Sequence, residues 1–327
     1  MTITLPTLRF YAYHGVLPQE RKVGGDYELT LHLQIDNDDA YEALCYDELE
    51  GTVNYAEAYE LVKQEMEKSS QLLEHVVARV ARALIRGFSK VREVQVDLTK
   101  CAPPIHGFSG RGASVSYSLR RKLFAWDFDG TIGDTHQGIV RTMSETFRQI
   151  GFPVPSAEAI CRTIGLPLAT SIEQLSGRQG TIIDKAVTLY RQLFEKIGCD
   201  GVTIFPSVAE EMRREHELGY FVGIATSRGH VSVEELCNQL GILPYIDFIV
   251  ACEDVAAHKP NPDPVLRLNE LTHTLPIDTT IVGDTTYDIE MGVNAGATHL
   301  IGVSWGNHTP QMLRDAGATQ IVMSFEK

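Results

Sequence analysis

The hydrophobic pattern of the chain changes at about residue 120. Before that point apolar residues alternate with polar ones, and the segment 27–35 places every second side chain, all of them apolar, on one face. Strict alternation is typical of a β-strand with one buried and one exposed face. After residue 120 the apolar residues come in short uninterrupted runs, such as 123–126 and 221–225, which are typical of strands buried on both faces of a parallel sheet. The sequence therefore predicts two domains with different folds.

The first domain, residues 1–120, is predicted to be α+β. Alternation recurs in 3–10, 94–98 and 115–119, and the stretch between the second and third strands has helical spacing in 55–66 and 73–84. The order strand, strand, helix, helix, strand, strand indicates an antiparallel sheet that carries two helices. Because a four-stranded sheet of this kind has exposed edges, we expect the domain to form a homo-oligomer.

The second domain, residues 121–327, is predicted to be α/β and Rossmann-like. Further apolar runs occur at 248–251, 280–282 and 300–303, with helical stretches between them. This alternation is typical of a parallel sheet covered by helices. Residues 138–205 interrupt it with mainly helical material, which we interpret as an inserted helical cap.

The composition limits the classes of function. The 327 residues carry a formal net charge of −14, and the clustered lysines and arginines that bind nucleic acid are missing from the sequence. The six cysteines lack CxxC spacing, which argues against a disulfide framework or a thiolate zinc site. No apolar stretch approaches the roughly 20 residues of a membrane helix. We expect a cytoplasmic protein that acts on small molecules and binds neither nucleic acid nor membranes.

Two acidic motifs follow predicted strands of the second domain. Asp127 and Asp129, in DFDGT, come directly after one apolar run, and Asp284 and Asp288, in GDTTYD, follow another. Ligands of open α/β sheets bind at the carboxyl ends of the strands. Carboxylates from two strand ends make an oxygen-rich site that suits Mg2+. Two acids one residue apart can also supply a nucleophile and a proton donor on one loop.

A hydroxyl and a positive charge complete the predicted site. Thr226 follows the run 221–225, and Lys259 precedes Pro260. Phosphoryl transfer requires both kinds of group, because they neutralise the transferring oxygens. DFDGT could by itself be only an acidic turn, but the presence of all four elements in order disfavours that alternative.

Residues 122–327 resemble the haloacid dehalogenase (HAD) superfamily, and its phosphoglycolate-phosphatase-like members in particular. The resemblance is carried, in order, by DFDGT at 127–131, Thr226, Lys259 and GDTTYD at 283–288. It implies that Asp127 is the nucleophile, which forms an aspartyl phosphate, and that Asp129 protonates the leaving alcohol and then activates water. Thr226 and Lys259 would hold the phosphoryl group.

The same resemblance implies a magnesium ion. Asp127, Asp284 and the main-chain carbonyl of Asp129 would bind Mg2+, and Asp288 would support the metal through hydrogen bonds or water. Caps of this kind also occur in phosphosugar mutases, in which the aspartyl phosphate is not rapidly hydrolysed. The sequence therefore leaves phosphatase and mutase chemistry both open.

The first 120 residues resemble dihydroneopterin aldolase, a folate-pathway enzyme with the small fold called the T-fold. The resemblance is carried by YHGVLPQER at 13–21, TVNYAE at 52–57, LLEHVVARVA at 72–81, and the Lys100 region that ends in PPI at 103–105. A dihydropterin contains an imine that accepts the electrons of the broken carbon–carbon bond. The cleavage therefore requires a base, an acid and a carboxylate that pairs with the pterin edge, but no metal.

This second resemblance implies a role for each of five polar residues. Glu74 would bind the pterin edge, Lys100 would transfer protons through water, and Tyr55 would contribute from a neighbouring subunit. Glu20 would bind the side-chain hydroxyls, and His14 borders the site. Spacing alone also allows structural roles, with Glu74 on a solvated helix flank, Lys100 as a surface charge and Tyr55 in the core.

Together, the two resemblances predict a bifunctional enzyme of folate biosynthesis. Dihydroneopterin must lose its phosphates before the aldolase cleaves it to 6-hydroxymethyl-7,8-dihydropterin and glycolaldehyde, and the fused phosphatase would act on dihydroneopterin monophosphate. Three alternatives remain open. The phosphatase could act on an unrelated ester, such as phosphoglycolate, or on esters in general, the T-fold half could be an epimerase, or that half could serve only as a non-catalytic platform for oligomerisation.

Overall fold

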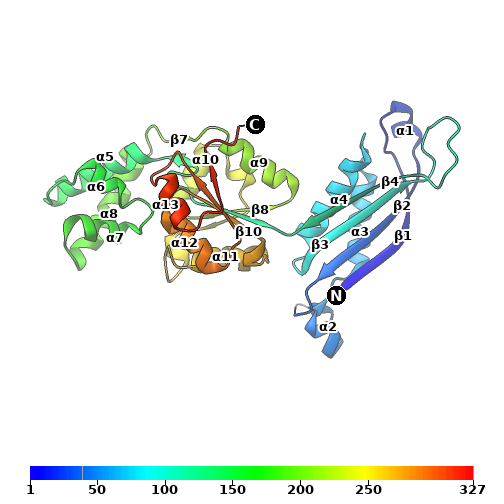
Figure 1. Ribbon diagram of the computed structural model, residues 1–327, viewed down its shortest axis with the longest axis horizontal. Coiled ribbons are helices and arrows are strands. Elements are labelled where there is room, and N and C mark those ends of the chain that lie inside the picture. The colour runs from blue at the N-terminus through cyan, green and yellow to red at the C-terminus, as the bar shows by residue number, and fades with distance from the viewer. Residues whose placement is uncertain (39, 327) are drawn as a thin grey trace. The chain divides into compact units, whose positions relative to one another are not determined.

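The computed structural model describes residues 1–38 and 40–326, and the chain divides into two compact units, Met1–Arg121 and Lys122–Lys327. Each unit is built around a main sheet of its own (Figure 1).

The first unit is an antiparallel sheet that carries two long helices. Its strands pair in chain order and are β1 (Thr2–Ala12), β2 (Gly25–Ile35), β3 (Val91–Lys100) and β4 (Ala113–Arg120). Helix α4 (Leu73–Gly87) packs against β3 and β4, and α3 (Tyr55–Glu67) packs against β1, so both cover the same face (Figure 1). The short elements are α1 (Pro18–Val23), α2 (Tyr41–Tyr46) and the 3-10 helix η1 (Leu49–Gly51).

The alternating pattern of β2 explains the core of this unit. The five side chains on its apolar face are all buried: Tyr27, Leu29, Leu31, Leu33 and Ile35. The apolar stripe of α4, which packs against β3 and β4, is also fully buried at Val76, Val80 and Leu84. The two long helices and the four strands therefore follow the predicted order, and the short helices are additions at the connections.

The second unit contains a parallel sheet with strand order β12-β11-β10-β5-β8-β9. In chain order the strands are β5 (Leu123–Trp126), β8 (Phe221–Ala225), β9 (Phe248–Val250), β10 (Thr279–Gly283), β11 (His299–Val303) and β12 (Gln320–Val322). The first five correspond to the predicted apolar runs. The edge strand β12 was not predicted, because it is only three residues long and begins with an exposed glutamine.

Helices cover both faces of this sheet, with α9 and α10 on one side and α11 and α12 on the other (Figure 1). The long helices outside the insertion are α9 (Val208–Leu218), α10 (His230–Gln239), α11 (Asp263–Thr272) and α12 (Thr286–Ala295). A shorter helix, α13 (Pro310–Asp315), follows them. Between them lie the 3-10 helices η3 (Leu243–Tyr245), η4 (Cys252–Asp254) and η5 (Pro276–Asp278). Within residues 1–38 and 40–326, no helix has the length and apolar character needed to cross a membrane.

A helical insertion follows β5. It consists of α5 (His136–Ile150), α6 (Ala157–Cys161), α7 (Leu168–Ser176), α8 (Thr181–Leu193) and the π-helix η2 (Phe194–Gly198). These helices gather at one end of the unit, where α5 packs against α8 (Figure 1). A two-stranded ribbon of β6 (Gly133–Asp134) and β7 (Thr203–Ile204) joins the beginning and the end of the insertion.

Candidate active sites

Three buried carboxylates meet at the carboxyl edge of the parallel sheet. Asp127 follows β5, Asp284 follows β10, and Asp288 lies in the first turn of α12. The strands β5 and β10 are neighbours, and the Asp127 N–H donates to the Val282 carbonyl at 2.8 Å. One oxygen of each carboxylate lies within 4.8 Å of the other two, so the three groups can share one cation.

The Lys259 ammonium lies between two of these carboxylates. It donates to Asp127 Oδ1 at 2.5 Å and to Asp288 Oδ1 at 2.6 Å, and its side chain is 1% exposed. Burial raises the pKa of Asp127 well above its usual value, although the charge of Lys259 opposes the rise. Burial lowers the pKa of Lys259, but the two carboxylates outweigh it and the net pKa is raised. One ammonium among three carboxylates leaves an excess of negative charge that a divalent cation can neutralise.

Asp284 is fixed by three hydrogen-bond donors. The Thr131 hydroxyl donates to Oδ1 at 3.0 Å, and both the N–H and the side-chain amide of Asn307 donate to Oδ2 at 2.7 Å. Burial, and after it the charge of Asp288, raises the pKa of Asp284 to about 7. The carboxylate is therefore held in one orientation but bears an electrostatic cost when it is ionised.

Two glycines allow the main chain to approach Asp284. Gly130 has φ +90°, and a Cβ at this position would lie 2.4 Å from Asp284 Oδ2. A Cβ at Gly306 would lie 2.2 Å from Asp284 Cβ. Since neither contact is sterically possible, the turn at Gly130 and the loop at Gly306 can lie against Asp284 only with glycine at these positions.

Asp288 both caps α12 and orients Lys259. The Thr285 N–H and hydroxyl donate to Asp288 Oδ2 at 2.9 Å and 2.7 Å, while Oδ1 accepts from Lys259. A carboxylate is favoured at this end of a helix because unpaired N–H groups make it positive. The helix N-terminus therefore helps to hold the ammonium against Asp127.

The Asp129 carboxylate is paired with an arginine that the sequence did not predict. Arg228 donates from Nε to Oδ2 at 3.1 Å and from Nη2 to Oδ1 at 2.5 Å, and the Thr135 hydroxyl donates to Oδ1 at 2.6 Å. The guanidinium carbon lies 4.3 Å from the ring centre of Phe194, at the start of η2. Asp129 is thus held by Arg228 and Thr135, and the contact of Arg228 with Phe194 links it to the inserted helices.

Thr226 lies at the end of β8, next to this pair. Its N–H donates to the Val250 carbonyl at 3.0 Å, and its hydroxyl oxygen accepts from the Arg228 N–H at 3.1 Å. Together with Asp127 and Asp129 it lines a cavity of about 360 Å3. The residues that follow β5 and β8 therefore line the same cavity.

The inserted helices line the other side of this cavity. Its apolar wall includes Ile139, Met143, Leu166, Leu168, Phe194 and Val231. Its charged residues besides Asp127, Asp129 and Arg228 are Arg191, Glu195, Glu235 and Glu253. The loop 164–168 also lines the cavity.

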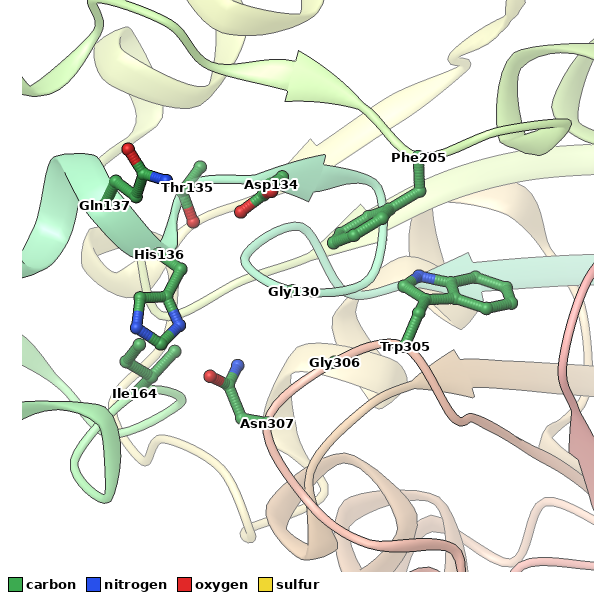
Figure 2. Close-up of a pocket in the computed structure, with 10 residues that line it drawn as sticks. All are labelled: Gly130, Asp134, Thr135, His136, Gln137, Ile164, Phe205, Trp305, Gly306 and Asn307. Carbon is green, nitrogen blue, oxygen red and sulfur yellow. The ribbon is translucent and has the colours of Figure 1, made fainter. Parts of the chain in front are cut away.

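A second cavity, of about 340 Å3, lies beside the turn at Gly130. Figure 2 shows Phe205 and Trp305 together on one side, with their ring centres 5.9 Å apart, and His136 on the other. Asn307 also lines it and donates to Asp284. This cavity therefore borders the acidic centre through Asn307.

In the first unit, three of the five predicted residues come together. Lys100, at the end of β3, forms a short ion pair with Glu20 and donates to the His14 carbonyl at 3.0 Å. The Tyr27 hydroxyl donates to the same carbonyl at 2.6 Å. Burial lowers the pKa of the His14 ring to about 4, and the charges of Arg79 and Lys100 add to the effect. His14 is therefore a neutral imidazole beside an ammonium–carboxylate pair.

The other two predicted residues lie on the surface of this unit. Tyr55 is the first residue of α3 and is 66% exposed, and Glu74 is exposed in the first turn of α4. Within residues 1–38 and 40–326, neither side chain forms a hydrogen bond or ion pair with Lys100, Glu20 or His14. Hydrogen bonds and an ion pair thus link three of the five residues to one another.

Comparison with known proteins assigns the two units to two families. Residues 124–302 match the family model described as haloacid dehalogenase-like hydrolase. The chain belongs to this family. Residues 3–118 match the model for dihydroneopterin aldolase. The predicted fusion, the T-fold of the first half and the HAD fold of the second are thereby confirmed, and the protein is an enzyme with a lyase half and a hydrolase half.

Relatives of the HAD half are named as phosphatases. "Probable phosphatase IndB" of Dickeya dadantii is 32% identical over 211 residues, which are 63% of this chain and 91% of that protein. "Pyrophosphatase PpaX" of Bacillus velezensis is 31% identical over 181 residues, 55% of this chain and 82% of that protein. A hydrolase structure from Pseudomonas syringae has a TM-score of 0.57 at 22% identity and covers 62% of this chain and 94% of its own.

The acidic centre fits the magnesium ion expected of a HAD enzyme. The carboxylate oxygens of Asp127, Asp284 and Asp288 are hard donors that lie close together, and burial and the charge of Asp288 raise the pKa of Asp284 to about 7, a charge crowding that a cation relieves. The Asp129 carboxylate instead accepts hydrogen bonds from Arg228 and Thr135.

Sequence reasoning missed three groups around the HAD centre. Arg228 follows Thr226 by two residues, and a basic residue so close to a strand end is a signal that could have been used. Asn307 and Thr131 carried no comparable signal, because their role depends on the distant Asp284.

Proposed function

We propose that this protein removes phosphate from dihydroneopterin monophosphate at the HAD centre and cleaves the resulting dihydroneopterin at the aldolase centre. The observation that carries the proposal is the presence, in one chain, of a phosphoryl-transfer centre and a dihydroneopterin aldolase domain. Two consecutive reactions of one substrate are the simplest reason for such a fusion.

In the first half-reaction, an oxygen of Asp127 attacks the phosphorus of the ester. The bond between phosphorus and the alcohol oxygen breaks, and Asp129 supplies the proton that the alcohol needs in order to leave. Lys259 holds Asp127 in place and, with the Thr226 hydroxyl, neutralises the phosphoryl oxygens. In the second half-reaction, water attacks the aspartyl phosphate, its proton passes to Asp129, and Asp127 is released.

A bound magnesium ion would reduce the repulsion between the anionic ester and the carboxylates. Its expected ligands are Asp127, Asp284 and the main-chain carbonyl of Asp129, with Asp288 in a supporting role through Lys259 and Thr285. Thr131 and Asn307 keep Asp284 oriented for this task.

The cavity chemistry supports a ring-shaped leaving group without negative charge. Three carboxylates, Glu195, Glu235 and Glu253, line the cavity. Arg191 adds one positive charge to the lining, whereas Arg228 is already paired with Asp129. A glycolate leaving group would face these carboxylates and would leave much of the 360 Å3 unfilled. A pterin presents flat surfaces to the apolar wall and N–H donors to the carboxylates.

The aldolase half uses the paired Lys100 and Glu20 in our proposal. Lys100 moves the proton between the side-chain hydroxyl and the ring carbon through water, and Glu20 binds the side-chain hydroxyls. The exposed Glu74 and Tyr55 are available to complete the pterin site in a homo-oligomer, with Tyr55 supplied by a neighbouring subunit.

A substrate panel tests the proposal. Purified protein with Mg2+ is given dihydroneopterin monophosphate, phosphoglycolate, pyrophosphate and p-nitrophenyl phosphate, and kcat/KM is measured for each. We expect dihydroneopterin monophosphate to exceed the others by at least about tenfold. If phosphoglycolate or pyrophosphate is preferred instead, the phosphatase half serves another pathway.

Two variants separate the two reactions. Asp127→Asn should abolish phosphate release while dihydroneopterin is still cleaved, and Lys100→Ala should do the opposite. Chromatography of the pterin products distinguishes cleavage, which yields 6-hydroxymethyl-7,8-dihydropterin, from epimerisation. If neither the parent nor Lys100→Ala converts dihydroneopterin, the T-fold half serves only as an oligomerisation platform.

A further inference from the structure

The Arg228 guanidinium contacts several polar and aromatic groups. Its side chain is 8% exposed and that of Asp129 is 16% exposed. Two of its nitrogens face the two oxygens of Asp129, and Nη1 donates to the Ser232 hydroxyl at 3.1 Å. The side-by-side pairing of guanidinium and carboxylate fixes the plane of the carboxylate as well as its position.

The aromatic rings of two different segments enclose the guanidinium. Its carbon lies 4.3 Å from the ring centre of Phe194 in η2 and 5.9 Å from that of Phe128, the residue between Asp127 and Asp129. Cation–π contacts of this kind are strengthened when water is excluded. Arg228 therefore has little freedom to leave Asp129 without disturbing the contact with the inserted helices.

We propose that Arg228 is a positioning residue that aligns Asp129 for hydrolysis of the aspartyl phosphate. The proposal rests on the proposed roles of Asp127 and Asp129. The second half-reaction requires an oxygen of Asp129 to face the attacking water, and the paired guanidinium fixes the plane in which that oxygen lies. The water oxygen bonds to phosphorus, the bond to the Asp127 oxygen breaks, and the water proton moves to Asp129. Arg228 holds the accepting carboxylate in one plane while this occurs.

The two half-reactions can be separated with p-nitrophenyl phosphate. Its phenol leaves without needing a proton from Asp129, so formation of the aspartyl phosphate releases p-nitrophenol as a rapid burst, and hydrolysis sets the rate of the steady state. In Arg228→Met we expect a burst close to one phenol per active site, followed by a steady state about tenfold to a hundredfold slower than that of the parent. Arg228→Lys, which keeps a donor but not the paired geometry, should lie between the two.

A double-mutant comparison tests whether Arg228 acts through Asp129. Asp129→Asn alone should show the same burst and slow steady state. Adding Arg228→Met to Asp129→Asn should change the steady state by less than about threefold, because the group to be positioned is already lost. Arg178→Met, which changes an exposed arginine just after α7, is the matched control and should behave as the parent.

Two results would overturn the proposal. One is a burst rate in Arg228→Met that falls as much as the steady state, since loss of structure would slow both phases equally. The other is a full additional loss in the double variant, which would show that the two residues act independently. Failure of the proposed function is distinguishable, because it would appear as Asp127→Asn retaining activity and as the absence of any phosphorylated parent enzyme.

Discussion

Replacing Lys259 by Met tests the electrostatic design of the HAD centre. The change keeps a side chain of similar length and removes the ammonium that lies 2.5 Å from Asp127 Oδ1 and 2.6 Å from Asp288 Oδ1. The side chains of these two aspartates are 7% and 1% exposed, so bulk water screens the loss of the cation only weakly. Removing one partner of a buried ion pair costs about 3–5 kcal/mol. We expect the free energy of unfolding to fall by that amount at about pH 8 in EDTA.

The loss should depend on pH and on Mg2+. Burial already raises the pKa of Asp127, and loss of the opposing Lys259 raises it further. A carboxyl with a raised pKa stabilises the fold while it is protonated, and this stabilisation is lost as the pH rises through the folded-state value. The deficit of the variant should therefore shrink as the pH falls. A divalent cation at about one hundred times its Kd would add about 2.7 kcal/mol to the free energy of unfolding. Because the variant lacks the ammonium that neutralises these carboxylates in the parent, Mg2+ should stabilise the variant more than the parent.

Urea unfolding followed by tryptophan fluorescence measures this loss of stability in the second structural unit, which contains Lys259. Both tryptophans, Trp126 and Trp305, lie in Lys122–Lys327. Lys185→Met, at an exposed position of α8, is the matched control and should change stability by less than about 0.5 kcal/mol. A deficit below about 1 kcal/mol for Lys259→Met at about pH 8 in EDTA would refute the reasoning.

Three further predictions concern other buried titratable side chains. Burial raises the pKa of Glu215 well above its usual value even though the Trp126 indole donates to it. The free energy of unfolding of the parent should therefore fall as the pH rises from about 4.5. Glu215→Gln should remove this pH dependence, measured by urea titrations followed by tryptophan fluorescence. The pKa of about 4 at buried His14 means that the first unit loses up to about 3 kcal/mol as the pH falls from about 6.5 to about 4. Hydrogen exchange of peptides from β1 to β4 should show this loss, and unchanged protection would contradict it. Lys100→Ala should lower aldolase turnover by about 10² or more in product chromatography while phosphate release stays within twofold of the parent.

Local patterns carried most of the fold prediction. The alternation of β2 and the apolar runs of β5, β8 and β10 are properties of neighbouring residues, and burial on one or both faces follows from them directly. The three-residue strand β12 has no such pattern, because it forms only where β11 offers it a partner.

The sequence by itself determined that Asp127 follows one strand and Asp284 another, because each acid directly succeeds an apolar run. Strand ends of a parallel sheet share an edge, so the acidic centre could be predicted before any coordinate. Only the tertiary structure decided that Arg228 pairs with Asp129, a residue 99 positions away. A side-chain contact across that separation depends on strand order and on rotamers, and neither is encoded in the spacing of nearby residues.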